Sequence, residues 1–450
     1  MEVRGNHAAG NRLRGKIGLF SASSIVIANM VGAGIFTTSG LLMGGLGNPT
    51  MLIGLWLLGG VISLCGALAY AELGAAMPKA GGEYVFLSQI YHPLFGFLTG
   101  WVSFLVGFTA PIAASSIGFS EYFIRSFPAM LGYSKVMAVL VIVIFTLVHL
   151  RGLKFGAAVQ NVLTVMKVGM IIILILLCFT LGKGNLQHFS QGSPVEWNFS
   201  GFKSMGLSLL WIMFAYSGWN ASTYIGSEIR DPAINIPRSL MLGTGVVLVL
   251  YVLLNVVYIY TIPPGEMKGV ISIGGLAIRN AFGSAMEVTF SLLIAFALFS
   301  SLSAFIILGP RVYYAMAEDG YFFRFLARVH PRYHVPSIAI LLQAGIAIIM
   351  VLSGTFGQIL TYMGFALGLF PLLTVAGALK MRLSGKARMQ LRGYPVFLLA
   401  YLFFGVIMLV LSFLERPVES SIALLTVALG IPVYFYFRKT RRDRSRPVPT

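Results

Sequence analysis

The sequence predicts an all-α polytopic membrane protein with twelve transmembrane helices, and three observations carry this prediction. Of the 450 residues, 57% are apolar and only 10% are charged, whereas soluble domains carry about 25% charged residues. The apolar residues gather in runs that are long enough to cross a bilayer as helices, which takes ~20 residues. Two of these runs, 17–43 and 204–227, contain no charged residue but are interrupted by glycine.

The expected spans are separated by short loops, and the longest external loop, 182–202, is too small for a soluble domain. The twelve spans cover approximately residues 17–44, 50–77, 93–124, 136–150, 156–181, 203–228, 237–262, 285–310, 336–353, 358–379, 394–414 and 420–437.

The positive charges predict the topology. If the N-terminus is in the cytoplasm, the cytoplasmic segments hold 24 of the 32 Lys and Arg residues and the external segments hold 7. This asymmetry follows the positive-inside rule, so both tails, 1–16 and 438–450, are expected on the cytoplasmic side of the cell (inner) membrane. The net charge of +18 then indicates contact with anionic lipid headgroups rather than with nucleic acid.

The first ten spans form two sets of five, 17–181 and 203–379, and the last two spans, 394–437, follow them. Glycine breaks lie at Gly34 and Gly218, in the first span of each set. Because five is odd, the second set enters the membrane from the opposite side. The sequence therefore predicts a 5+5 inverted repeat with discontinuous helices one and six.

The first break is Val31-Gly32-Ala33-Gly34-Ile35. A helix that ends at Val31 exposes carbonyls, and a helix that starts near Ile35 exposes N–H groups and a positive dipole end. Carbonyls suit an ammonium and N–H groups suit a carboxylate, so the break matches the two groups that every α-amino acid shares. Two such breaks in corresponding places indicate the substrate site of a transporter, with a glycine packing notch as the alternative.

The second break, around Ser217-Gly218-Trp219-Asn220, offers the carbonyls of Phe214, Ala215 and Ser217 to an ammonium group. Aromatic side chains surround it. We expect Phe214 and Trp219 to act as a gate over the bound side chain, with simple packing as the alternative.

Lys167 is the only basic residue inside a span, where a lysine costs ~2.5–3.5 kcal/mol. It continues a polar stripe with Gln160 and Thr164 at helical spacing, so it faces protein. We expect its ammonium to bind the freed carbonyls of span one, where a transporter otherwise places Na⁺. Snorkelling to an interface is the alternative.

The acidic residues lie at span ends and are expected to be solvated caps or gate salt bridges. Because a cationic cargo would need a buried carboxylate, this placement favours a neutral cargo, and a cationic amino acid or a polyamine is the alternative. The residues concerned are Glu72, Glu83, Glu228 and Glu318 on the cytoplasmic side and Glu121, Glu266 and Glu287 on the external side.

Five motifs resemble those of the amino acid–polyamine–organocation superfamily, closest to bacterial permeases near the L-type amino acid transporters. They are Gly32–Phe36, Pro78–Tyr84, Phe214–Asn220, Glu228–Pro232 and Arg311–Gly320. The resemblance implies the leucine-transporter-type fold, with spans one and six unwound.

The resemblance also implies a binding site. The substrate carboxylate would meet the N–H groups of Ala33 and Gly34, and its ammonium would meet the carbonyls of Met30, Phe214 and Ser217. Lys167 matches a fifth-span lysine of sodium-independent members, which would lie near the carbonyls of Ala28 and Val31.

The chain departs from the family in three places. Ala33 stands where serine is frequent, and Ser217 stands where glycine is frequent and narrows the pocket. No cysteine lies between Arg125 and Lys135, the segment through which animal light chains join a glycoprotein partner. We therefore expect no disulfide-linked heavy chain.

These observations predict a sodium-independent transporter of neutral L-amino acids that exchanges or facilitates by alternating access. Proton coupling stays open. The sequence has no His-Glu-x-x-His or Gly-x-Ser-x-Gly motif, so an enzyme is not expected, and neither is a cofactor or a metal site. Two inverted halves do not supply the symmetric filter of a channel.

Overall fold

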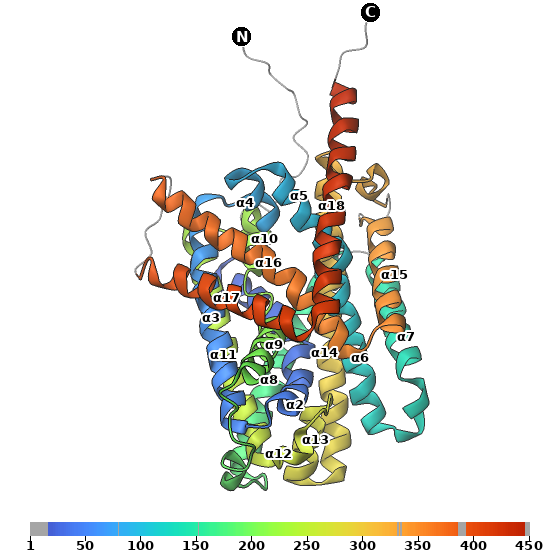
Figure 1. Ribbon diagram of the computed structural model, residues 1–450. Coiled ribbons are helices and arrows are strands. Elements are labelled where there is room, and N and C mark those ends of the chain that lie inside the picture. Colours follow the sequence, from blue (N-terminus) through green and yellow to red (C-terminus); the bar gives the residue numbers. More distant parts are fainter. Residues whose placement is uncertain are drawn as a thin grey trace, which may run out of the picture.

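The computed structural model describes residues 17–445 except 80, 152, 331–332, 334 and 386–392, and helices make up most of the described chain (Figure 1). The helices are α1 Leu19–Met30, α2 Ala33–Leu46, α3 Pro49–Ala76, α4 Glu83–Ile90, α5 Pro93–Val102, α6 Thr109–Ser126, α7 Ser134–His149, α8 Leu153–Thr180, α9 Phe199–Ala215, α10 Ala221–Tyr224, α11 Pro232–Thr261, α12 Pro264–Met267, α13 Ile273–Phe282, α14 Ser284–Glu318, α15 Ser337–Ser353, α16 Phe356–Leu383, α17 Val396–Glu415 and α18 Pro417–Ser445.

The prediction of a polytopic helical membrane protein is confirmed. Nine helical stretches of the described chain are long and apolar enough to cross a membrane. Three shorter apolar helices, Thr164–Thr180, Phe199–Ala215 and Ser337–Ser353, coincide with the spans expected fifth, sixth and ninth.

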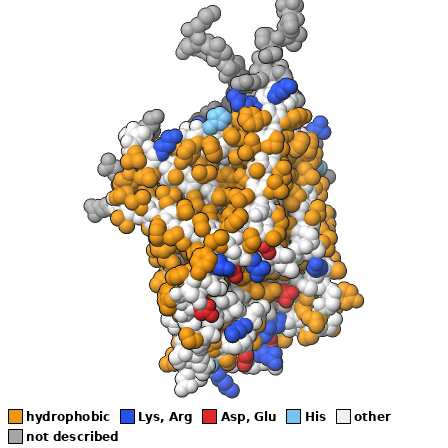
Figure 2. Space-filling view, viewed as in Figure 1, with side chains coloured by type: hydrophobic (Ala, Val, Ile, Leu, Met, Phe, Trp, Pro, Cys, Tyr) orange, Lys and Arg blue, Asp and Glu red, His pale blue; other side chains and the backbone are white. Residues whose placement is uncertain are grey.

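The outer surface of the bundle is apolar over a broad belt, and lysine and arginine gather above and below it (Figure 2). Large apolar side chains stand exposed on the outer helices, among them Ile144 on α7, Leu176 on α8 and Phe403 on α17. A water-soluble monomer rarely exposes so much apolar surface. This apolar surface fits contact with lipid. Helices can lie in lipid because their backbone N–H and C=O groups are satisfied within the helix.

Both glycine-bearing spans are interrupted. The chain passes from α1 to α2 through Val31 and Gly32, and Gly32 is extended rather than helical. Five residues in turns, 216–220, separate α9 from α10. Among them Gly218 has a φ of +98°, which glycine adopts without steric cost. The halves pair crosswise, since α1 packs against α10 and α2 against α9.

Some helices extend past the expected span ends. The helix α14 continues through Pro310 to Glu318, so the stretch after Arg311 extends span eight. The helix α18 runs to Ser445, past the expected end of span twelve at 437. The short helix α4 lies between the spans expected second and third. The expected tail 1–16 lies outside the described residues.

A candidate amino acid site at the two helix breaks

The end of α1 is bound by a lysine. Lys167, which is 1% exposed on α8, places its Nζ 3.3 Å from the Ala28 carbonyl oxygen and donates a hydrogen bond to the carbonyl of Val31. The Ser301 hydroxyl of α14 donates to the same Val31 carbonyl at 3.2 Å and lies 3.3 Å from Nζ. These carbonyls have no intrahelical donor, and the negative end of the helix dipole favours a cation there.

The two breaks pack directly on each other. A Cβ placed on Gly34 would lie 2.5 Å from the Cα and the Cβ of Ala215, so the backbones meet where no side chain fits. The Tyr251 hydroxyl of α11 lies 2.6 Å from the Met30 carbonyl oxygen and 3.1 Å from that of Ala215. One tyrosine thus bridges a freed carbonyl from each break, and sequence reasoning missed it.

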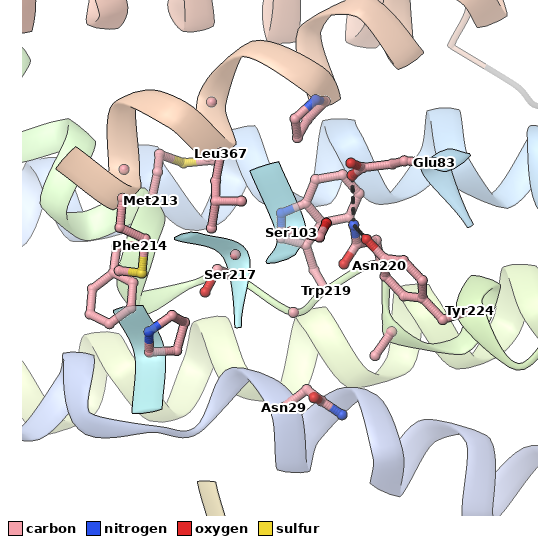
Figure 3. A pocket seen from close by; sticks show the side chains of 18 of the residues that line it. Asn29, Glu83, Ser103, Met213, Phe214, Ser217, Trp219, Asn220, Tyr224 and Leu367 are labelled. Carbon is pink, nitrogen blue, oxygen red and sulfur yellow. Dashed lines mark hydrogen bonds between the residues drawn. The ribbon is translucent and has the colours of Figure 1, made fainter. Parts of the chain in front are cut away.

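A cavity of about 280 Å³ opens beside the second break. Its wall is mostly apolar and aromatic, with a few polar groups, which is the usual character of a small-molecule site. Figure 3 shows Phe214 and Ser217 toward one end and Glu83, Asn220 and Tyr224 toward the other. The remaining wall comes from the break itself, from Asn29 of α1 and Ile62 of α3, from α6, α14, α16 and α17, and from a π-helical turn, Ser103–Gly107.

The structure brings only part of the predicted site to this cavity. Phe214, Ser217 and Trp219 line it. The other predicted residues are packed inside the protein next to the cavity, because the contact between Gly34 and Ala215 closes the space between the breaks. These packed residues are Met30, Ala33, Gly34, Ile35 and Ala215.

Trp219, one of the two predicted gate residues, packs between two aromatic rings. Its ring meets that of Tyr70 edge-on, with 4.7 Å between centroids, and that of Tyr401 at 6.2 Å. Such tilted contacts are favourable for aromatic pairs. Trp219 therefore joins the break to α3 and α17 in this conformation.

Glu83 corrects a sequence-based expectation, because it is a cavity residue rather than a solvated cap. It is 6% exposed and lines the cavity. Its Oε1 accepts hydrogen bonds from the Tyr70 hydroxyl at 2.6 Å and from the Asn220 amide at 2.9 Å. Burial raises the pKa of Glu83 to about 7, although both hydrogen bonds act to lower it. The preceding glycines turn the chain inward, with φ of +121° at Gly81 and +51° at Gly82.

Two of the other acidic residues considered in the sequence form ion pairs, as expected. Glu72 pairs with Arg382 at 2.7 Å, joining α3 to α16, and Glu287 pairs with Arg125. The side chain of Glu228 lies outside the described residues. Within the described part of the chain, no three His, Cys, Asp or Glu side chains converge on a metal-sized space.

Comparison with known proteins agrees with this geometry. A model of the amino acid permease family matches residues 17–435. The chain is 29% identical to the serine/threonine exchanger SteT of Bacillus subtilis, over 97% of this chain and 99% of that protein. It is 28% identical to the human Asc-type amino acid transporter 1, over 94% and 82% of the two chains. It is also 28% identical to the human large neutral amino acids transporter small subunit 2, over 96% and 82%.

The match over nearly the whole chain confirms the superfamily that the motifs resemble. It also confirms the prediction of a transporter rather than an enzyme. The chain belongs to the amino acid permease family.

Proposed function

We propose that this permease exchanges neutral L-amino acids across the cell membrane by alternating access, without sodium. The observation that carries the proposal is the pair of facing helix breaks, with the Lys167 ammonium on the carbonyls that end α1. The relatives support it, since they include a serine/threonine exchanger and a transporter of large neutral amino acids.

The substrate carboxylate is assigned to the N–H groups of Ala33 and Gly34, which open α2 and have no intrahelical acceptor. The substrate ammonium is assigned to the carbonyls of Met30, Phe214 and Ser217, and its side chain to the space beside Ile35 and Ala215. In the described conformation the Tyr251 hydroxyl donates a hydrogen bond to the Met30 carbonyl. When substrate binds, the two breaks separate and the substrate ammonium replaces the tyrosine hydroxyl at this carbonyl.

Lys167 supplies the charge that a sodium ion supplies in other transporters. Its ammonium meets two carbonyls of α1 and the hydroxyl of Ser301, so it joins the broken helix to α8 and α14. A protein-borne cation at this place removes the need for a bound ion. This supports sodium-independent transport.

The packing of equivalent helices supports twelve spans with a 5+5 inverted repeat in 17–181 and 203–379. The helices assigned to spans two and seven, α3 and α11, pack together, and so do those assigned to spans three and eight, α6 and α14. The crosswise pairs α1 with α10 and α2 with α9 complete the pattern expected around a two-fold axis in the membrane plane.

The cavity lies toward the end of the bundle that carries α4. The positive-inside rule assigns this end, together with both termini, to the cytoplasm. At the opposite end, the Gly269 N–H donates to the Gly40 carbonyl at 2.8 Å, and the Gly274 N–H donates to the Tyr122 hydroxyl at 3.0 Å. We assign the conformation as inward-facing, with Phe214 and Trp219 as gate residues.

We propose that no disulfide joins this chain to a heavy chain. The two cysteines of the sequence, Cys65 and Cys178, lie within α3 and α8, away from the loop that the resemblance implicates.

A second candidate function is a carrier of cationic amino acids or polyamines, or a proton-coupled carrier. The specific observation in its favour is Glu83, a buried carboxylate in the cavity wall. Its presence weakens the argument for neutral cargo from the placement of the acidic residues.

Counterflow tests the proposal. Proteoliposomes loaded with unlabelled L-alanine should accumulate labelled L-alanine equally in sodium and in choline buffer, and a proton uncoupler should leave uptake unchanged. Competition by L-serine and L-leucine but not by L-arginine or putrescine supports neutral cargo. Uptake that needs sodium, or that collapses with the uncoupler, contradicts the proposal.

A further inference from the structure

The inner end of the cavity carries an anion that the exchange mechanism above does not use. Glu83 stands at the first position of α4 and reaches the cavity wall. Its Oε1 holds the Tyr70 hydroxyl and the Asn220 amide. Among the side chains that the structure describes, none donates to its Oε2 and no Lys, Arg or His forms an ion pair with it.

The described groups that face Glu83 are neutral, and apart from the Asn220 amide they are aromatic. The ionisable ones are Tyr70 from α3, Tyr224 from α10 and Tyr401 from α17. Trp219 packs between Tyr70 and Tyr401, and its indole lines the cavity. A carboxylate with aromatic rings close by is an environment that binds alkylammonium groups, through charge pairing and cation–π attraction.

Burial makes the charged form of Glu83 unfavourable. A carboxylate that is buried without a cation is strongly disfavoured, so it takes up a proton or meets a positive ligand. The raised pKa of Glu83 corresponds to uptake of a proton. An organic ammonium that enters from the cytoplasm would be the positive ligand.

We propose that Glu83 is an ammonium-binding site at the inner end of the cavity, separate from the helix breaks, where an amino acid stops on its way between the cytoplasm and the central site. The inference rests on the proposed transport function. Figure 3 shows the separation, because Glu83, Asn220 and Tyr224 lie at the end opposite Phe214. The ammonium that binds Glu83 is either the α-ammonium of the cargo or the terminal ammonium of a cationic cargo, and the test below distinguishes the two.

The test uses everted membrane vesicles, which expose the cytoplasmic face, and right-side-out vesicles, both containing the full chain. The probe is ethylamine, which has an ammonium but no carboxylate, and propionate is its matched anion. At about pH 8, above the pKa of the carboxyl, ethylamine should inhibit L-alanine exchange in everted vesicles. Glu83→Gln should raise its half-inhibitory concentration about tenfold or more, since a hydrogen bond to a charged group is lost.

Glu266→Gln is the matched control, because it makes the same change in an exposed carboxylate paired with Asn280 on the opposite face. It should leave inhibition unchanged. Equal inhibition of the wild type and Glu83→Gln overturns the proposal. If L-alanine loses affinity in Glu83→Gln, the α-ammonium is the ligand. If instead L-lysine competes with L-alanine in the wild type and only the affinity for L-lysine falls, the ligand is the side-chain ammonium.

Two further measurements test Glu83 if the variant does not fold or if the wild type does not transport amino acids. If Glu83→Gln does not fold, ethylamine inhibition of the wild type should weaken as the pH falls from about 8 to about 6, because the carboxyl takes up a proton. Flat inhibition over that range overturns the site. If the wild type transports no amino acid, the proposed function fails, and thermal stabilisation by ethylamine that is lost in Glu83→Gln still tests Glu83.

Discussion

The Lys167 ammonium donates a hydrogen bond to the Val31 carbonyl at the residue where α1 stops. The two residues are 136 positions apart in the sequence. A cation at the C-terminal end of a helix satisfies freed carbonyls and the helix dipole together. The break and the lysine therefore stabilise each other, and neither is favourable alone at this depth.

Replacing Lys167 with alanine should slow exchange at least tenfold. The carbonyl of Ala28 would lose its donor, whereas that of Val31 would keep only the Ser301 hydroxyl. An unsatisfied buried group costs ~1–3 kcal/mol. Initial rates of labelled L-alanine counterflow in proteoliposomes measure the effect. Lys183→Ala, which changes an exposed lysine, is the control. A Lys167→Ala protein that folds and exchanges at the normal rate would refute the assigned role.

Gly34→Ala should separate the two breaks and abolish exchange. The added methyl group would lie 2.5 Å from the Cα and the Cβ of Ala215, and overpacking of this kind costs ~1–3 kcal/mol. Gly45→Ala is a matched control in the same helix, since a Cβ there meets nothing within 4 Å. Adding Ala215→Gly should restore part of the lost thermal stability, and no restoration would show that the two residues are not coupled.

The sequence predicted the features that depend on local patterns. An uncharged span broken by glycine indicates a discontinuous helix, and a lysine deep in a span must find a partner because burial is costly. The inward turn of Glu83 could not be predicted in this way. Its partners Tyr70 and Asn220 lie 13 and 137 positions away, and its place at a span end suggested solvent.

Tyr251 was missed for a similar reason. A tyrosine within an apolar span normally indicates packing or an interfacial position. Its function as a bridge follows only from the folded arrangement, which brings Met30 and Ala215 to one hydroxyl over separations of 221 and 36 residues.

Ser217→Gly should widen the range of cargo toward bulky side chains. Ser217 is half-buried in the cavity wall, and a difference of one small group in a pocket changes discrimination by about tenfold or more. Competition by L-phenylalanine against L-alanine should therefore improve by that factor. Ser217→Ala removes the hydroxyl but keeps the Cβ, so improvement in both variants would attribute the effect to the hydroxyl group rather than to the Cβ.

Glu83 should make the unliganded protein less stable as the pH rises. Its pKa is about 7 in the folded protein against an ordinary value of 4.5, so the folded state holds the proton more tightly. That stabilisation is complete below about pH 4.5 and is lost as the pH passes through about 7, by about 3 kcal/mol at ~1.4 kcal/mol per pKa unit.

Thermal unfolding in detergent across this range measures the effect. Glu83→Gln should gain stability relative to the wild type between about pH 5 and about pH 8. A constant difference between the two proteins would show that Glu83 does not titrate in this window.

The cation that ends α1 is covalently part of the protein, so it stays behind when the cargo leaves. If Lys167 remains charged, each cycle carries one zwitterion inward and one outward, and the membrane voltage, worth about 2.3 kcal/mol per charge for every 100 mV, does no work on it. Such a carrier is electroneutral. It equalises the ratios of different amino acids on the two sides, and the cell sets its direction by maintaining a pool of the outgoing one.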